Sequence, residues 1–406
     1  MVRYLVKVRE GMQEDVSKSF RMMGFRVVKR FNTYMSVEAP EDVADKILAV
    51  QGVVSVEKER TYGISAFIEL PVEKQLVKFL RMGGPLNPLA MWYVIKEGMG
   101  KDRWPTSDSR TVLQADVAEK MGITGKGITV AVVDTGFDIG CPQKLTIDFQ
   151  ASTIEGDPIW IDNNGHGTHC LTTIAGNPLQ TVFGQLEGVA KGVSIGAVKV
   201  LGYLIGSGST LDVMEGIATA IYNGAKVISM SLGSTIGPSE RHDPTACSLC
   251  SFIENLADKG YIFCIAAGND GKGYTSCPGL SRGAITVAAL DKNLTRADFS
   301  SCEHPDYIRY SKPDIGAPGV NIGASTTGLI GAMNWYEGPK VAFISGTSMA
   351  TPHISGLMAL WAEYAQKKGY NLTRSMVMDI FKSYSSWNSE IGYGVPKFSW
   401  IVDYLK

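Results

Sequence analysis

Strand-like and helix-like hydrophobic patterns alternate over the first 62 residues. Tyr4, Val6 and Val8 alternate with polar residues, which predicts a strand. Residues 12–23 have helical periodicity and end at Gly24, a residue typical of helix ends. Three strands and a second helix are expected after this point.

Two of these strands are predicted at 25–31 and 34–38, joined at Asn32 and Thr33, and the last at 53–58. We expect Pro40 in the first turn of a helix that runs to about Val50. Its apolar face is predicted to consist of Val43, Ile47 and Leu48. The resulting order βαββαβ predicts a small ferredoxin-like α+β unit.

From about residue 111 the pattern becomes that of an α/β protein. Short β-branched runs alternate with helical segments near 209–223 and 252–259. The runs are 128–133, 194–200, 227–231, 261–266 and 284–288. This alternation predicts a mainly parallel sheet covered by helices on both faces. The residues between the two patterns, 66–110, contain Gly-Pro and Asn-Pro breaks and are interpreted as a connector and an N-terminal extension.

Composition excludes some classes of function. The formal net charge of −1 argues against a nucleic-acid partner held by bulk electrostatics. The absence of an apolar run of about 18 residues predicts that no helix spans a membrane. The N-terminus lacks the apolar run of about 7–15 residues that a signal peptide needs, so we expect a cytoplasmic protein as encoded. The alternative is secretion by a non-standard route or with a leader removed.

The segment Val132-Val133-Asp134-Thr135-Gly136 places a carboxylate directly after an apolar strand. In open α/β sheets, ligand sites lie at this carboxyl end of the strands. Taken alone, however, Asp134 is better explained as an aspartate that caps a turn.

A second segment, Asn164 to Cys170, contains His166 between two glycines, where a substrate can approach closely. His166 and His169 are also spaced like metal ligands on a helix. The segment lacks the glutamate of the His-Glu-x-x-His metalloprotease pattern, so we interpret His169 as structural.

A third segment, Ser345 to His353, leads into an apolar helix. Ser348 is predicted at the N-terminus of that helix, where backbone N–H groups can stabilise a developing oxyanion. A serine before a helix is more commonly an N-cap, so Ser348 alone would not define a site.

Together these segments resemble the subtilisin family of serine proteases. Asp-Thr-Gly, His-Gly-Thr-His and Gly-Thr-Ser-Met-Ala-Thr-Pro-His occur in that family's order, Asp then His then Ser. The likeness covers roughly residues 111–406, including the segment Gly392 to Pro396. It implies a serine endopeptidase that works through an acyl-enzyme, with the three-layer α/β/α fold.

The resemblance also implies a role for each residue. Ser348 would be the nucleophile, His166 the general base and acid, and Asp134 the group that orients His166. Asn269, in the segment Ala266-Ala267-Gly268-Asn269, would donate to the oxyanion together with the backbone of Ser348.

Substrate binding is expected on two glycine-bearing strand edges, by pairing with an extended peptide. One edge consists of Gly206, Ser207 and Gly208, and the other of Ser231, Leu232 and Gly233. The primary pocket is expected between the second edge and Ala266, Ala267 and Gly268, with Asp270 at its rim. We expect a preference for large apolar or aromatic side chains, with some tolerance for Lys or Arg through Asp270.

Family likeness gives the N-terminal unit a role as well. Residues 1–65 resemble a subtilisin propeptide, which assists folding and inhibits the active site until the chain cuts itself. Self-cleavage is expected near residues 62–70, before a catalytic domain of residues 111–406. The alternative is an independent small domain. We expect a monomer whose partners are protein or peptide substrates.

No cofactor is expected for the chemistry, and metal sites stay open at this stage. Many relatives bind calcium near the catalytic aspartate, but Gln143 stands where they have an aspartate, and only Asn177 of the second loop matches. Calcium elsewhere remains an alternative. The spacing Cys247-Ser-Leu-Cys250 is that of a metal half-site, with Cys277 and Cys302 as partners. Zinc, a disulfide and free thiols are the three alternatives for these four cysteines. The chain has seven cysteines in all, and this odd number excludes complete intramolecular pairing.

Two rival functions follow from the same residues. One is a non-catalytic relative that only binds peptides, against which the complete set of Asp134, His166, Ser348 and Asn269 argues. The other is a protease with a narrow processing role rather than general protein degradation, which the sequence does not distinguish.

Overall fold

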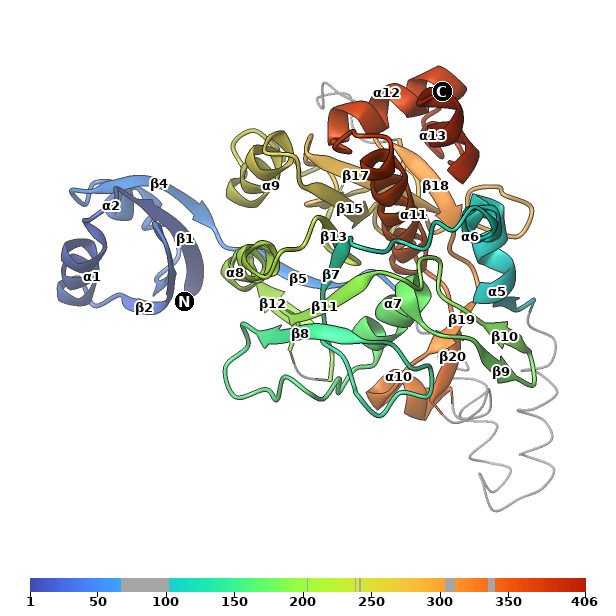
Figure 1. Cartoon of the computed structure of the whole chain (residues 1–406). Coiled ribbons are helices and arrows are strands. Elements are labelled where there is room, and N and C mark those ends of the chain that lie inside the picture. The colour runs from blue at the N-terminus through green and yellow to red at the C-terminus, as the bar shows by residue number, and fades with distance from the viewer. Residues whose placement is uncertain (67–101, 203, 238, 241, 304–310, 335–339) are drawn as a thin grey trace, which may run out of the picture.

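The computed structural model describes residues 1–66, 102–202, 204–237, 239–240, 242–303, 311–334 and 340–406. The N-terminal unit is a four-stranded antiparallel sheet in the order β2-β3-β1-β4, packed on two helices (Figure 1). Its elements are β1 (Val2–Val8), α1 (Gln13–Met22), β2 (Arg26–Phe31), β3 (Tyr34–Ala39), α2 (Ala44–Leu48) and β4 (Val53–Lys58). Alternate residues of β1, Tyr4, Val6 and Val8, form a core with Val16 and Phe20 of α1.

The ferredoxin-like order and most of its boundaries agree with the sequence prediction, but the second helix is shorter than expected. It spans Ala44–Leu48 rather than starting at Pro40. Asp42 adopts a left-handed backbone with φ of +63°, which a continuous right-handed helix cannot contain. Leu48 is 49% exposed, so its predicted place on the apolar face is wrong.

The main domain is built on a seven-stranded parallel sheet in the order β18-β17-β15-β13-β7-β11-β8. These strands are β18 (Ile315–Pro318), β17 (Ala284–Leu290), β15 (Ile262–Ala266), β13 (Val227–Met230), β7 (Thr129–Asp134), β11 (Ser194–Lys199) and β8 (Ile147–Ser152). The five predicted strands are confirmed within two residues at each end. The two edge strands, β8 and β18, were not predicted.

Helices cover both faces of this sheet, which confirms the three-layer α/β/α fold (Figure 1). Along β7, Val130 and Val132 join the core on one face, whereas Ala131 and Val133 join the core on the other. The first core contains helices α6 (Ala115–Lys120), α7 (His166–Ala175), α10 (Gly328–Met333), α11 (Thr347–Lys367), α12 (Arg374–Tyr384) and α13 (Phe398–Tyr404). The second contains α8 (Thr210–Tyr222) and α9 (Ser248–Asp258), the latter starting four residues before the predicted segment.

Smaller sheets surround the main one. A four-stranded sheet in the order β12-β5-β14-β16 joins β5 (Thr61–Ile64) to β12 (Ser207–Ser209), β14 (Leu232–Ile236) and β16 (Thr275–Cys277). A three-stranded sheet contains β20 (Val341–Ile344), β19 (Ile322–Ser325) and β6 (Trp104–Pro105), and β9 (Leu179–Thr181) pairs with β10 (Gly184–Leu186).

The predicted connector 66–110 lies mostly outside the described residues, which resume at 102. From Trp104 onward it belongs to the main domain, because β6 pairs with β19 and is followed by α5 (Thr106–Ser109) and a 3₁₀ helix, Arg110–Leu113. Trp104 and Leu113 are buried in the first core. Within the described parts of the chain, no helix is both long and apolar enough to cross a bilayer.

Candidate active site

Asp134 and His166 meet at the carboxyl end of the parallel sheet. Asp134 is the last residue of β7 and His166 the first of α7, and both are completely buried. His166 Nδ1 donates to Asp134 Oδ1 at 2.7 Å, and the Thr135 N–H donates to the same oxygen. The carboxylate therefore fixes both the orientation and the tautomer of the ring, with Nε2 left as the acceptor.

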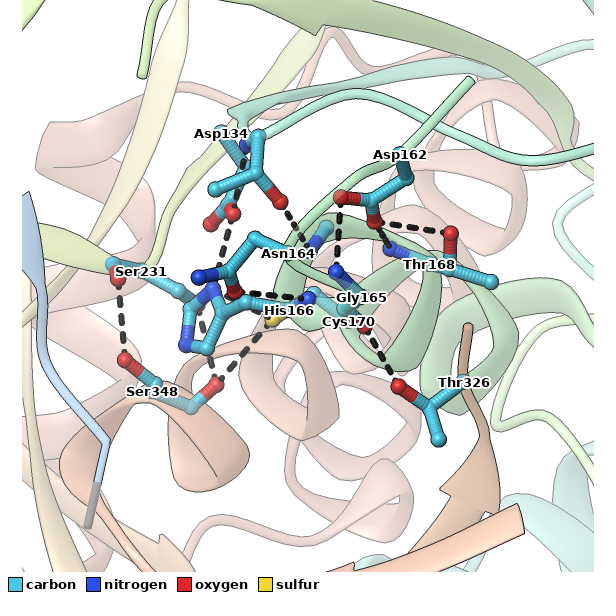
Figure 2. A network of polar contacts seen from close by, with 12 residues as sticks. Asp134, Asp162, Asn164, Gly165, His166, Thr168, Cys170, Ser231, Thr326 and Ser348 are labelled. Carbon is cyan, nitrogen blue, oxygen red and sulfur yellow. Dashed lines mark hydrogen bonds and ion pairs between the residues drawn. The ribbon is translucent and has the colours of Figure 1, made fainter. Parts of the chain in front are cut away.

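Ser348 lies in the first turn of α11 and points into the same space (Figure 2). Its hydroxyl donates to the Ser231 carbonyl at 2.9 Å, and its own carbonyl accepts from the Ser231 hydroxyl at 2.9 Å. His166 Nε2 is buried and has no hydrogen-bond partner among the described residues. The nucleophile-to-base hydrogen bond is thus not formed in this state, although the side chains converge.

The pKa values of His166 and His169 are shifted in opposite directions. Burial lowers the pKa of His166, but the Asp134 carboxylate outweighs it, and the net pKa is well above the ordinary value of 6.5. Burial lowers the pKa of His169 to about 3. His169 Nε2 donates to the carbonyls of Ile322 and Ala342, so His169 is a neutral structural residue, as its sequence context indicated.

Asp162 is a site residue that sequence reasoning missed. Its carboxylate accepts from the backbone N–H groups of Gly165 and Thr168 at 2.8 and 2.9 Å, and from the Thr168 hydroxyl (Figure 2). It therefore caps the N-terminus of α7 and holds His166 in place. In the sequence, Asp162 stands three residues before Gly165, the N-cap of α7, and an aspartate at this spacing is common in ordinary loops.

The N-terminal chain runs through the site as a β-strand. Strand β5 pairs antiparallel with β12 on one side, where Gly63 faces Ser207, and with β14 on the other, where Ile64 faces Leu232. Beyond β5, the Ser65 N–H donates to the Ser231 carbonyl at 3.2 Å. The Ser65 carbonyl in turn accepts from the Ser348 N–H at 3.0 Å.

Asn269 borders the same carbonyl oxygen. Its Oδ1 accepts from the backbone N–H and the hydroxyl of Thr347 at 2.9 and 3.0 Å, which turns Nδ2 outward. A methyl group added at Gly346 would lie 3.4 Å from Asn269 Nδ2 and 2.5 Å from the Ser65 oxygen. The Asn269 side-chain N–H group, a potential donor, and the Ser65 carbonyl oxygen therefore both lie beside Gly346.

A cavity of about 180 Å³ opens beside Ser65. Its polar lining includes Thr235 and Ser276, which the sequence did not suggest, and Asp270, whose carboxylate accepts from the Thr235 hydroxyl at 2.8 Å. The Ser65 side chain is too small to fill this volume. The cavity lies where the primary pocket is expected, and the exposed Asp270 is part of its lining.

Most of the predicted substrate-binding residues lie beside β5 or line the cavity, but Ala266 and Ala267 do neither. Gly206, Ser207 and Gly208 border β5 on one side, and Ser231, Leu232 and Gly233 border it on the other. Gly233 and Gly268 also line the cavity. Ala266 is buried in β15, and neither it nor Ala267 lines the cavity, because the chain turns toward the site only at Gly268, which has φ of +106°.

Charged residues of the N-terminal unit contact helices α8 and α9 of the main domain. Lys29 Nζ lies 2.5 Å from Asp212 and 2.7 Å from Glu215 of α8, and donates to the Thr153 carbonyl at 2.9 Å. Glu59 and Glu57 accept from backbone N–H groups in the first turns of α8 and α9. These carboxylates lie at the positive ends of the two helix dipoles.

Gln143 lies where the family resemblance led us to expect a calcium-binding carboxylate. Its Oε1 accepts from the Ser325 N–H at 3.0 Å, and its Nε2 donates to the Asn177 carbonyl at 3.2 Å. The Gln143 amide N–H therefore occupies the Asn177 carbonyl oxygen, which would otherwise be available to coordinate a cation.

The arrangement of Asp134, His166 and Ser348 around a peptide carbonyl defines the class of serine hydrolases with a Ser-His-Asp site. Residues 125–394 match the model of the Subtilase family, and the chain belongs to that family. It is a subtilisin-like serine endopeptidase, a hydrolase that acts on protein substrates and needs no cofactor for catalysis.

Curated relatives extend this match. The chain is 33% identical over 348 residues to M-protease of Shouchella clausii, covering 85% of this chain and 82% of the relative. It is 40% identical over 249 residues to Subtilisin Savinase of Lederbergia lenta, covering 61% and 81%. Because 85% of this chain cannot fit after residue 111, the first match extends into the segment before the predicted catalytic domain.

Proposed function

We propose that this endopeptidase is a zymogen that cleaves itself between Ser65 and Ala66, using Asp134, His166 and Ser348 as its catalytic triad. The observation that carries the proposal is the hydrogen bond from the Ser348 N–H to the Ser65 carbonyl. A carbonyl bound by the backbone of the nucleophile, at the end of a paired strand, is positioned as the scissile carbonyl of a substrate. The bond lies within the 62–70 range expected from the sequence.

The reaction follows from the contacts of each group. The Ser348 hydroxyl turns from the Ser231 carbonyl toward His166 Nε2, which takes its proton as Oγ bonds to the Ser65 carbonyl carbon. Asp134 stabilises the imidazolium formed in this step. The negative charge on the Ser65 oxygen is stabilised by the Ser348 N–H and by Asn269 Nδ2, both preorganised before the attack.

Collapse of this intermediate breaks the Ser65–Ala66 bond. His166 returns its proton to the Ala66 nitrogen, which leaves as an amine, and the acyl group stays on Ser348 Oγ. A water molecule, deprotonated by His166, then releases the Ser65 carboxylate and restores the enzyme. The same steps apply to a protein substrate paired with β12 and β14.

Residues 1–65 would inhibit the enzyme until they leave. Support comes from the complete burial of His166 and Ser348 and from the place of β5 between the two substrate-binding edges. The contacts of Lys29, Glu57 and Glu59 with α8 and α9 add affinity outside the site.

The primary pocket is proposed to take side chains larger than that of Ser65, since about 180 Å³ beside it is open. Large apolar and aromatic side chains fit by size, and Asp270 at the edge gives a basic side chain a partner. We also propose that the monomer needs no calcium at Gln143.

Mass spectrometry of the purified chain tests self-cleavage. Wild-type protein is expected to yield a fragment that ends at Ser65, and Ser348→Ala protein to remain intact. A fluorophosphonate probe should label the wild type and not the variant, which also excludes a non-catalytic peptide-binding protein. Labelling without a fragment ending at Ser65 would overturn the cleavage site but not the triad.

The compartment remains a prediction. The comparisons give the cytoplasmic expectation no support, and fractionation of the native host with the same probe distinguishes the cytoplasm from export.

A further inference from the structure

Three cysteines and a histidine form a buried cluster outside the active site. Cys247 and Cys250 belong to the first turn of α9, Cys277 ends β16, and His242 follows β14. All four are buried, and one potential ligand atom of each lies within 4.8 Å of all the others. Cys302, the fourth partner suggested by the sequence, is not in this cluster, because it pairs with Lys272 elsewhere.

The distances within the cluster are those of a tetrahedral metal site. Cys277 Sγ lies 3.7 Å from both Cys247 Sγ and Cys250 Sγ, and Cys250 Sγ lies 3.7 Å from His242 Nε2. Tetrahedral zinc with Zn–S bonds of about 2.3 Å separates two sulfurs by about 3.8 Å, and a sulfur from a nitrogen by about 3.6 Å. A disulfide needs about 2.0 Å, and pairing any two of the three would leave one buried thiol beside it.

We propose that His242, Cys247, Cys250 and Cys277 bind one structural zinc ion. Three thiolates and an imidazole are a donor set that zinc favours. The four ligands fill its tetrahedral coordination, so the ion has no open position and takes no part in catalysis. The proposal is independent of the peptidase activity.

The surroundings of the cluster favour thiolates. Cys247 is the N-cap of α9, and its Sγ accepts from the Cys250 N–H at 3.5 Å, so two ligands lie at the positive end of an 11-residue helix. Arg60 Nη2 lies 3.4 Å from His242 Nδ1, which brings a positive charge next to a site with a net charge of about −1 when zinc is bound. Arg60 also pairs with Glu240 at 2.6 Å.

The ion would brace the substrate-binding edge. His242 follows β14 and Cys277 ends β16, and these strands pair with each other in the sheet that holds β5. The Tyr62 hydroxyl of β5 lies 3.6 Å from Cys277 Sγ. Zinc would therefore fix β14, β16 and the start of α9 to one another beneath the strand that occupies the site.

Metal content tests the proposal. The full chain, purified under reducing conditions, is expected to contain about one zinc ion, and Cys277→Ser and Cys250→Ser to lose it. Cys302→Ser, another buried cysteine outside the cluster, is the matched control and should keep the ion. Any self-cleaved form still contains residues 242–277, so processing does not change the expected content.

Cobalt substitution provides a measurement that needs no variant. Co²⁺ added to the metal-free chain should give the visible bands of tetrahedral cobalt and thiolate charge transfer, and added Zn²⁺ should remove them. A chain without zinc or cobalt bands, with seven titratable thiols, would overturn the proposal. So would a native mass lowered by two hydrogens through a disulfide among Cys247, Cys250 and Cys277.

Discussion

The chemistry of His166 depends on what surrounds its two ring nitrogens. Nδ1 donates to Asp134, and Nε2 is buried without a partner among the described residues, beneath the N-terminal strand. The structure thus describes a base that is oriented but not yet bonded to its nucleophile. Release of residues 1–65 would expose the ring to water while the Asp134 contact remains.

The pH dependence of activity follows from this environment. The Asp134 carboxylate raises the pKa of His166 well above 6.5, and release from burial acts in the same direction. Since the base must be neutral, kcat/KM is expected to rise as pH passes upward through this raised pKa. The ion pair between protonated His166 and Asp134 also stabilises the folded state. This stabilisation is complete below pH 6.5, the ordinary pKa of histidine, and it is lost as the pH rises through the raised pKa of His166 in the folded protein.

The measurement is a pH profile of kcat/KM for a peptide substrate. Asp134→Asn should shift the ascending limb to lower pH and reduce kcat by about 10⁴-fold. An ascending limb at or below pH 6.5 in the wild type would contradict the assignment.

Asp270 is expected to set how well basic side chains are accepted. Its carboxylate is exposed at the pocket edge, where water weakens Coulombic attraction. Asp270→Asn should lower kcat/KM about 3- to 10-fold for substrates with Lys or Arg before the cleaved bond. Cleavage after Leu or Phe is the internal control and should not change. Equal effects on both kinds of substrate in a peptide library would exclude this role.

At the scale of elements, two helices and two strand edges create the binding site for the N-terminal unit. Strands β12 and β14 provide main-chain pairing, and α8 and α9 present their N-termini to Glu59 and Glu57. Lys29 forms ion pairs across this interface with Asp212 and Glu215 of α8. The burial of Lys29 lowers its pKa, but the two carboxylates outweigh this effect and raise it overall.

Lys29→Ala should weaken inhibition of the mature enzyme by the separate fragment 1–65. Two ion pairs that are partly exposed to water are together worth about 1 kcal/mol, so the inhibition constant should increase about 3- to 10-fold. Lys58→Ala is the control, because Lys58 pairs with Glu41 inside the unit and is exposed. An unchanged inhibition constant for Lys29→Ala would show that the Lys29 ion pairs contribute nothing to the affinity.

At the scale of the whole molecule, the loop containing Gln143 joins three distant parts of the chain. Ser325 and Asn177 are both held by the Gln143 amide, without a requirement for a cation. Addition of millimolar calcium is therefore expected to change the unfolding temperature by less than about 2 °C.

Gln143→Asp is the informative comparison. The variant loses the N–H that donates to Asn177 and gains a carboxylate, so it should be less stable and should recover stability when calcium is added. A wild-type unfolding temperature that rises steeply with calcium would contradict the prediction and place a cation site elsewhere.

Local sequence patterns determined much of the architecture. β-branched runs predicted five strands of the main sheet, because a parallel sheet covered on both faces requires continuous apolar strands. The two edge strands were not predicted. One side of each lacks a neighbouring strand, so β8 is only partly buried and β18 ends in a proline. The second helix starts at Ala44 rather than at Pro40, because propensity alone does not anticipate the left-handed backbone of Asp42.

The sequence by itself determined the family, and it predicted the triad and Asn269, because these are carried by short contiguous segments. Only the tertiary structure decided which groups meet. Asp162 beneath α7, Ser65 against Ser348, and His242 among the cysteines each depend on residues far apart in the chain. Such contacts are fixed by the packing of the sheet and its helices, and no local spacing encodes them.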